Sequence, residues 1–298
     1  MFYTAGEQYS YDLIYTVARA HFDAGKVDLE LGDFQRAYRA WREHVQPHIP
    51  QHDQPRPRFC NDAATEATLL RAIAVKSPLD DLPHYKEPKA FMQVASDRAR
   101  IEADAAHAEQ QYRSFQDRDP AFWKVFDLYV ENVACIDSKF SPGGTISTAL
   151  GVIYLSNPRK RSALALYELY VHECTHLMMF VDQARRRHYA SFEAIADKAN
   201  YCVSAIYEMD RPLDKVLHSL VVATELVLHR EHVLGHHDDT SVHPSTAKLV
   251  ESSRVTAEAM LEQQARRQLL APRGVWLVER CHEHLEGLAQ RRATPKVA

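Results

Sequence analysis

The feature that most constrains the fold is an apolar segment, around residues 164–180, that has three ionisable side chains at its centre. His172, Glu173 and His176 form the pattern H-E-x-x-H. The residues around the pattern are apolar: Leu164, Leu166, Leu169, Val171, Leu177, Met178, Met179 and Phe180. A helix that is apolar on nearly all sides is buried in a protein core. The segment therefore predicts a core helix around which the rest of the chain has to pack.

Two histidines and a carboxylate inside such a helix are costly unless something satisfies them. His172 and His176 are four residues apart, so a helix places both imidazoles on one face, where a single metal ion can bind both. In zinc peptidases with this motif the glutamate, here Glu173, takes a proton from the metal-bound water. The alternative is that the three residues are exposed, or are core residues satisfied by hydrogen bonds. We interpret them as a metal site, with Glu173 as its catalytic residue.

Two histidines do not complete a metal site, and the next strongly apolar helix, predicted from about residue 212 to 234, is the best source of a third ligand. Arg211, His218, Glu225 and His229 follow one another at spacings of seven, seven and four residues, so they form one polar stripe on this helix. His218 is the first candidate for the third ligand. Glu225 is the alternative, and would complete a set of two histidines and one carboxylate. The other interpretation of Glu225 and His229 is pairing with charged groups near the surface end of the helix.

The rest of the chain predicts a mainly α-helical protein with a small β-hairpin or short sheet beside the motif helix. Gly151–Ser156 is the strongest strand, because it is apolar and β-branched. Proline-rich stretches at residues 46–59 and 77–88 interrupt the helices and are predicted to be connectors. We expect a helical N-terminal region over residues 1–118 and a metal-site region over residues 119–298, although the two can also form a single domain.

Composition and charge exclude several classes of function. The net charge of −4 gives no electrostatic attraction to nucleic acid or to an anionic membrane. No apolar run approaches the roughly 20 residues that span a bilayer, and the N-terminus lacks the basic-then-apolar order of a signal peptide. The five cysteines are scattered and form no C-x-x-C pair, so neither a disulfide scaffold nor a cysteine-rich zinc site is expected. We expect a cytoplasmic protein that binds neither nucleic acid nor membrane.

Three short stretches, taken in order, resemble a known family. Gly151-Val152 begins the strand, His172-Glu173-x-x-His176-Leu177 lies on the motif helix, and Arg211-Pro212-Leu213 precedes Leu217-His218 on the later helix. This order is similar to that of the HExxH-motif peptide-modification proteins, which are found near the pathways of ribosomally made peptides. Ser219 replaces a glycine that is usual in the family. The resemblance covers about residues 145–235.

Some members of that family are similar to iron(II)- and 2-oxoglutarate-dependent oxygenases that hydroxylate a side chain of a peptide or an amino acid. The resemblance implies that His172, His176 and His218 are iron ligands, and that Glu173 orients a ligand or a water molecule. The distal carboxylate of 2-oxoglutarate then needs a cation. Arg211 is the first candidate for binding it, and the alternative interpretation is a helix-start arginine that pairs with a nearby acid. Arg230 is the second candidate. The substrate would be a peptide or an amino-acid-like molecule of natural product biosynthesis.

Two other functions stay open. In a zinc metallopeptidase, Glu173 would activate water and the edge of the strand Gly151–Ser156 would bind an extended peptide. The longer signature H-E-x-x-H-x-x-G-x-x-H is absent, because Asp182 stands where its last histidine would be. In a non-catalytic helical scaffold the metal would be structural. The histidine-rich stretch at residues 235–239 is predicted to be a solvated loop rather than a second metal site.

Overall fold

A computed structural model describes residues 1–49, 51–52, 57–60, 63–73, 98–136, 138 and 141–293. The predicted connector at residues 77–88 lies outside this part of the chain. Contacts within the chain form two compact units. The N-terminal unit contains Phe2 and residues 6–185, and the C-terminal unit contains Met1, residues 3–5 and residues 186–298. The division at residues 118–119 that the sequence suggests stays a prediction.

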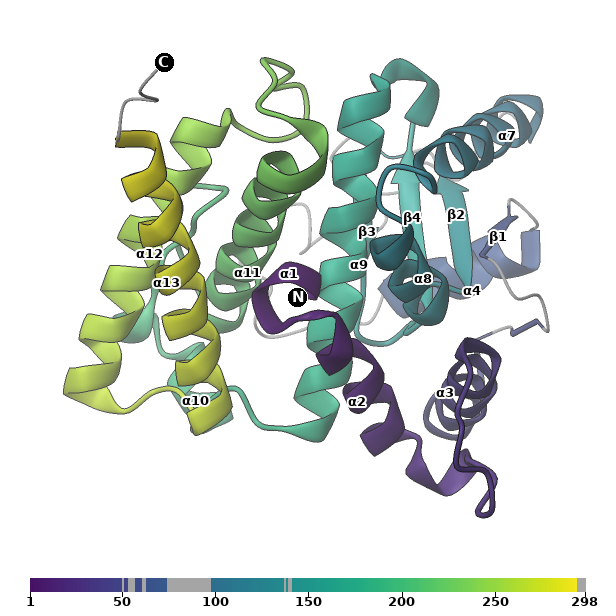
Figure 1. Ribbon diagram of the computed structural model, residues 1–298, viewed down its shortest axis with the longest axis horizontal. Coiled ribbons are helices and arrows are strands. Elements are labelled where there is room, and N and C mark those ends of the chain that lie inside the picture. The colour runs from purple at the N-terminus through teal and green to yellow at the C-terminus, as the bar shows by residue number, and fades with distance from the viewer. Residues whose placement is uncertain are drawn as a thin grey trace. The chain divides into compact units, whose positions relative to one another are not determined.

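Both units consist mainly of helices, which confirms the predicted fold class (Figure 1). After α1 (Phe2–Ala5), the N-terminal unit has α2 (Glu7–Val17), α3 (Leu31–Val45), β1 (Arg58–Cys60), α4 (Ala63–Ile73), α7 (Arg98–Phe115), α8 (Pro120–Tyr129), β2 (Asn132–Ile136), β3 (Gly143–Thr145), β4 (Val152–Ser156) and α9 (Ala163–Arg185). The C-terminal unit has α10 (Phe192–Ala196), β5 (Cys202–Val203), β6 (Asp210–Arg211), α11 (Leu213–His229), a π-helical turn (Arg230–Leu234), α12 (Thr246–Arg267) and α13 (Pro272–Ala293). In the described part of the chain, no helix has the length and apolar character needed to cross a membrane.

The N-terminal unit contains a four-stranded sheet with the strand order β1-β2-β4-β3. β1, β2 and β4 run parallel, and β3 pairs with β4 in the antiparallel direction. Tyr154 and Ala134 pack with Ala72 of α4 on one face of this sheet. Helices α7 and α9 also contact the sheet, at β1 and β2 and at β3 respectively (Figure 1). The predicted strand is confirmed as β4, and it is apolar throughout because it is buried along its whole length.

Helix α9 begins at Ala163, directly before the apolar segment. The Ser162 hydroxyl accepts a hydrogen bond of 3.1 Å from the Ala165 backbone N–H and so caps the first turn. Aromatic side chains hold the helix against α7 and α8: the Tyr167 ring lies 5.2 Å from that of Phe115 on α7 and 5.4 Å from that of Trp123 on α8, measured between centroids. These contacts bury one side of α9 within the unit. His172 and His176, which are partly exposed, lie on another side of the helix.

Helix α11 is the core element of the C-terminal unit. Every residue from Val216 to His229 is buried, as expected for a helix that is apolar on all sides. It packs against the long helices α12 and α13, which also pack against each other. Residues 235–245 form a loop, which confirms that prediction for the histidine-rich stretch. The two histidine-bearing helices of the predicted metal site thus belong to different units.

Gly151 provides a test of the packing at the beginning of β4. Its φ is +81°, and a Cβ added there would lie 2.1 Å from Nη1 of the buried Arg42. Gly151→Ala is expected to lower the free energy of unfolding by roughly 2–3 kcal/mol, because it combines a strained backbone with a displaced guanidinium group. Urea-induced unfolding measures the loss. Gly25→Ala is the control, since a Cβ there meets nothing within 4 Å. Equal stability of the two variants would contradict the expected clash.

Candidate metal centre

His172 and His176 lie side by side on α9. Their Nε2 atoms are 3.1 Å apart, and both rings are partly exposed whereas the residues around them are buried. Two imidazole nitrogens that bind one tetrahedral zinc ion at ordinary bond lengths are roughly 3.3 Å apart. The pair therefore has the spacing of two ligands of one ion, with little movement of either ring. A direct hydrogen bond between the two rings is the interpretation without a metal.

Glu173 follows His172 on α9 and is buried. The Thr145 hydroxyl of β3 donates a hydrogen bond of 2.7 Å to its Oε2 atom. Gly143, two residues earlier on the same strand, approaches so closely that an added Cβ would lie 3.1 Å from Oε1. Burial raises the pKa of Glu173 to about 8, although the hydrogen bond from Thr145 lowers it. The carboxyl group is thus enclosed between the motif helix and the last strand of the sheet.

The strand beside Glu173 is β3 and not the strand that the sequence suggests. β4 lies between β2 and β3, so both of its edges are already paired. The expectation that Gly151–Ser156 offers a free edge to a peptide is therefore wrong. Within the described chain β3 pairs only with β4. The position of β4 depends on pairing with distant segments, which an apolar, β-branched sequence does not specify.

Thr145 is a contact of Glu173 that sequence reasoning missed. Thr145→Val keeps the shape of the side chain but removes the donor to Glu173, and is expected to destabilise the protein by about 1–3 kcal/mol. Urea-induced unfolding measures the effect. Thr145→Ser, which keeps the hydroxyl group, is expected to retain most of the stability. A valine variant as stable as the wild type would show that the bond contributes nothing.

His218, the predicted third ligand, lies on α11 in the C-terminal unit and is 8% exposed. Burial lowers its pKa to about 3, and the positive charges of His188 and Lys215 act in the same direction. Its imidazole is therefore neutral at physiological pH, which is the form that binds metals. The assignment of His218 as the third ligand stays a prediction.

Glu225, the alternative third ligand, has other partners within the C-terminal unit. Its Oε1 atom lies 2.5 Å from the amino group of Met1 and accepts a hydrogen bond of 2.7 Å from the Thr4 backbone N–H, and its Oε2 atom accepts one of 3.0 Å from Tyr3. Burial alone would raise the pKa of Glu225, but the Met1 ammonium group and the other donors lower it to about 2. Both oxygens are thus occupied, which favours His218 over Glu225 as a ligand.

The two arginines considered for a carboxylate ligand also lie in the C-terminal unit. Arg211 is 4% exposed, and its guanidinium group stacks over the Tyr207 ring at 4.7 Å from the centroid. Arg230 is fully buried and donates a hydrogen bond of 2.8 Å to the Pro244 carbonyl oxygen. Arg230 therefore has a structural role at the π-helical turn. Arg211 remains the better candidate, because the Tyr207 ring that it contacts is exposed at the surface.

A further group of possible ligands was missed by sequence reasoning. Glu258 of α12 and His282 and Glu286 of α13 have ligand atoms that all lie within 4.8 Å of one another. Their only signal in the sequence is the spacing of four residues between His282 and Glu286. Arg254 donates a hydrogen bond of 2.5 Å to Glu286, and the group lies at the surface. We interpret it as an ion-pair network between the two helices.

No family model and no curated protein matches this chain. The assignment of a metal site therefore depends on His172, Glu173 and His176 and on their surroundings, and not on a relative of known activity. The resemblance to the HExxH-motif peptide-modification proteins rests on the three short stretches of sequence that carry it.

Proposed function

We propose that the protein is a metal-dependent enzyme whose ion is bound by His172 and His176, next to the buried carboxyl group of Glu173. The observation that carries the proposal is the 3.1 Å separation of the two Nε2 atoms on a helix that is otherwise buried on nearly all sides. The two rings are partly exposed while the residues around them are buried, so an ion from solution can reach both nitrogens. A divalent metal ion is the partner that suits this set of donors.

For the chemistry, we propose an iron(II)- and 2-oxoglutarate-dependent oxygenase that hydroxylates a side chain of a peptide or an amino-acid-like molecule. The support is the family resemblance together with the neutral state of His218 and the buried guanidinium group of Arg211. His218 would complete the ligand set, and Arg211 would bind the distal carboxylate of 2-oxoglutarate. Iron(II) and 2-oxoglutarate together supply the oxidising power for attack on a C–H bond. Glu173 would orient a neighbouring ligand or water molecule.

Metal analysis of the protein purified without added metal is the first test. The expected result is iron or an empty site. Anaerobic loading with iron(II) and 2-oxoglutarate should then produce a visible charge-transfer band. Succinate should then form together with a substrate that gains about 16 Da. If the protein binds zinc tightly at one ion per chain and never consumes 2-oxoglutarate, the oxygenase function is excluded.

A zinc metallopeptidase is the second candidate, and the position of β3 favours it. The Ser156 backbone N–H bonds to the Pro142 carbonyl oxygen, so the alternation of an antiparallel pair directs the N–H group of Gly143 and the backbone groups of Thr145 away from β4. An extended peptide could pair with them beside Glu173, which would take a proton from a water molecule. Zinc would polarise the scissile carbonyl group. Peptide cleavage that Glu173→Gln abolishes would support this candidate.

A further inference from the structure

The two carboxyl oxygens of Glu173 have different surroundings. The Thr145 hydroxyl donates a hydrogen bond of 2.7 Å to Oε2, and within the described part of the chain this is the one hydrogen bond that the Glu173 side chain accepts. Oε1 lies beside Gly143, where an added Cβ would be 3.1 Å away, and it is not fully enclosed by protein atoms. One oxygen is thus held by the protein, whereas the other keeps its capacity to accept.

One face of β3 is shaped to hold this carboxyl group. Gly143 and Thr145 are two residues apart, so they lie on the same face of the strand. Gly143 has no side chain, which lets the strand backbone approach Oε1 closely. Thr145 is β-branched, so its χ1 angle is restricted, and its hydroxyl also lies 3.3 Å from the Glu173 carbonyl oxygen. A stiff donor at short range orients the carboxyl group more sharply than a flexible side chain would.

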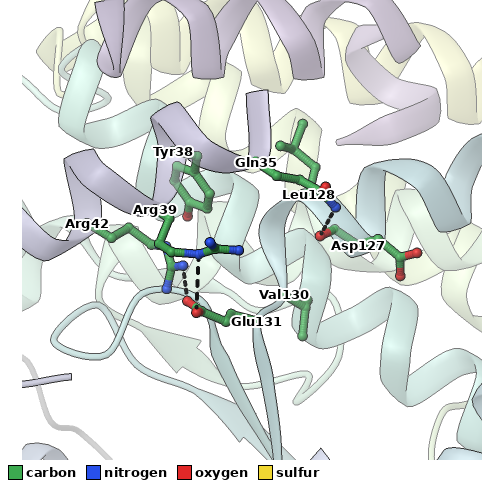
Figure 2. A pocket seen from close by; sticks show the side chains of 8 residues that line it. All are labelled: Gln35, Tyr38, Arg39, Arg42, Asp127, Leu128, Val130 and Glu131. Atoms are coloured by element: carbon green, nitrogen blue, oxygen red, sulfur yellow. Dashed lines mark hydrogen bonds and ion pairs between the residues drawn. The ribbon is translucent and has the colours of Figure 1, made fainter. Parts of the chain in front are cut away.

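The strand that carries Thr145 is itself held in place. It pairs with β4 along its whole length, and the chain between the two strands is anchored to α3. Gln46 accepts a hydrogen bond of 2.7 Å from the Leu150 backbone N–H, and Arg42 donates one of 3.2 Å to the Leu150 carbonyl oxygen. Figure 2 shows that Arg42 pairs in turn with the buried Glu131. The Thr145 hydroxyl therefore has a fixed position relative to the sheet.

We propose that Thr145 is a positioning residue of the metal centre, which holds Glu173 through Oε2 so that Oε1 meets the water molecule or ligand at the ion. The inference rests on the proposed function, and it applies to the oxygenase and to the peptidase, because both use Glu173 beside a group at the ion. Without the donor on Thr145, the carboxyl group can turn about its last C–C bond. Loss of such a supporting contact typically weakens binding or activity at a metal site by about 10- to 100-fold.

Binding of acetohydroxamate to the cobalt(II)-loaded full chain, measured by visible absorption, tests the role of Thr145. The two oxygens of this probe chelate the ion, and its protons can be donated to a neighbouring carboxyl group. Thr145→Val is expected to weaken binding by about 10-fold or more, whereas Thr145→Ser, which keeps the hydroxyl, is expected to retain most of the affinity. Glu173→Gln should weaken binding at least as much as Thr145→Val. Adding Thr145→Val to Glu173→Gln should then cause no further loss, because Thr145 acts through Glu173.

Thr148→Val is the matched control, because it removes a hydroxyl from the chain after β3 that donates to the Ala72 carbonyl oxygen, at 3.4 Å. It should bind the probe as the wild type does. All variants are compared at a temperature at which each is folded, so a loss of stability alone does not change the result. Wild-type affinity in Thr145→Val, or an equal loss in the wild-type and Glu173→Gln backgrounds, would overturn the inference and leave the metal centre standing. A wild type that binds no cobalt would instead overturn the proposed function, and this inference with it.

Discussion

Replacement of His172 or His176 by Ala is expected to lower the affinity for a divalent metal ion by more than about 100-fold, and to abolish any activity of the protein. Each variant leaves one imidazole where the wild type has two Nε2 atoms 3.1 Å apart. A single histidine on a helix retains too few bonds to hold the ion. Titration of the metal-free protein with zinc, cobalt or iron(II), followed by calorimetry or metal analysis, measures the loss.

His44→Ala is the control for this experiment, because His44 is an exposed histidine in the same unit. It should bind metal as the wild type does. Glu173→Gln separates a catalytic metal from a structural one, since it should keep the metal and lose the activity. Unchanged metal affinity in His172→Ala would show that the ion, if any, is bound elsewhere. The surface group of Glu258, His282 and Glu286 is the first place to look in that case.

Glu131→Gln is expected to cost about 3–5 kcal/mol of the free energy of unfolding, the largest effect on stability that we predict. The change keeps the size of the side chain but removes the negative charge, and so leaves the buried Arg42 without its ionic partner. Arg39 and the His52 backbone N–H lose the same charge. Urea-induced unfolding, followed by circular dichroism, measures the difference.

Glu109→Gln is the matched control, because Glu109 also pairs with an arginine in the same unit but is 40% exposed. Exposed pairs of this kind contribute less than about 1 kcal/mol. A variant of Glu131 that loses no more than the Glu109 variant would contradict the importance of the buried pair.

Much of the local structure could be predicted from the sequence. The burial of α9 and the helix α11 follow from patterns within about one or two turns of chain. The side-by-side histidines follow from their spacing of four residues on a helix. The sequence also placed His218, Glu225 and His229 on one core helix, although Arg211 of the predicted stripe lies in β6. The partner of Glu225 was not foreseen. That partner is the N-terminal segment, more than 200 residues away in the chain.

The sequence by itself determined that this protein is mainly helical and that His172 and His176 share one face of a core helix. Helical periodicity is a local property, so a single segment is enough to establish it. Only the tertiary structure decided that β4 is an inner strand, that β3 encloses Glu173 together with α9, and that Arg42 is buried against Glu131. These contacts join segments far apart in the chain. They depend on how the whole unit packs, which no local pattern of residues contains.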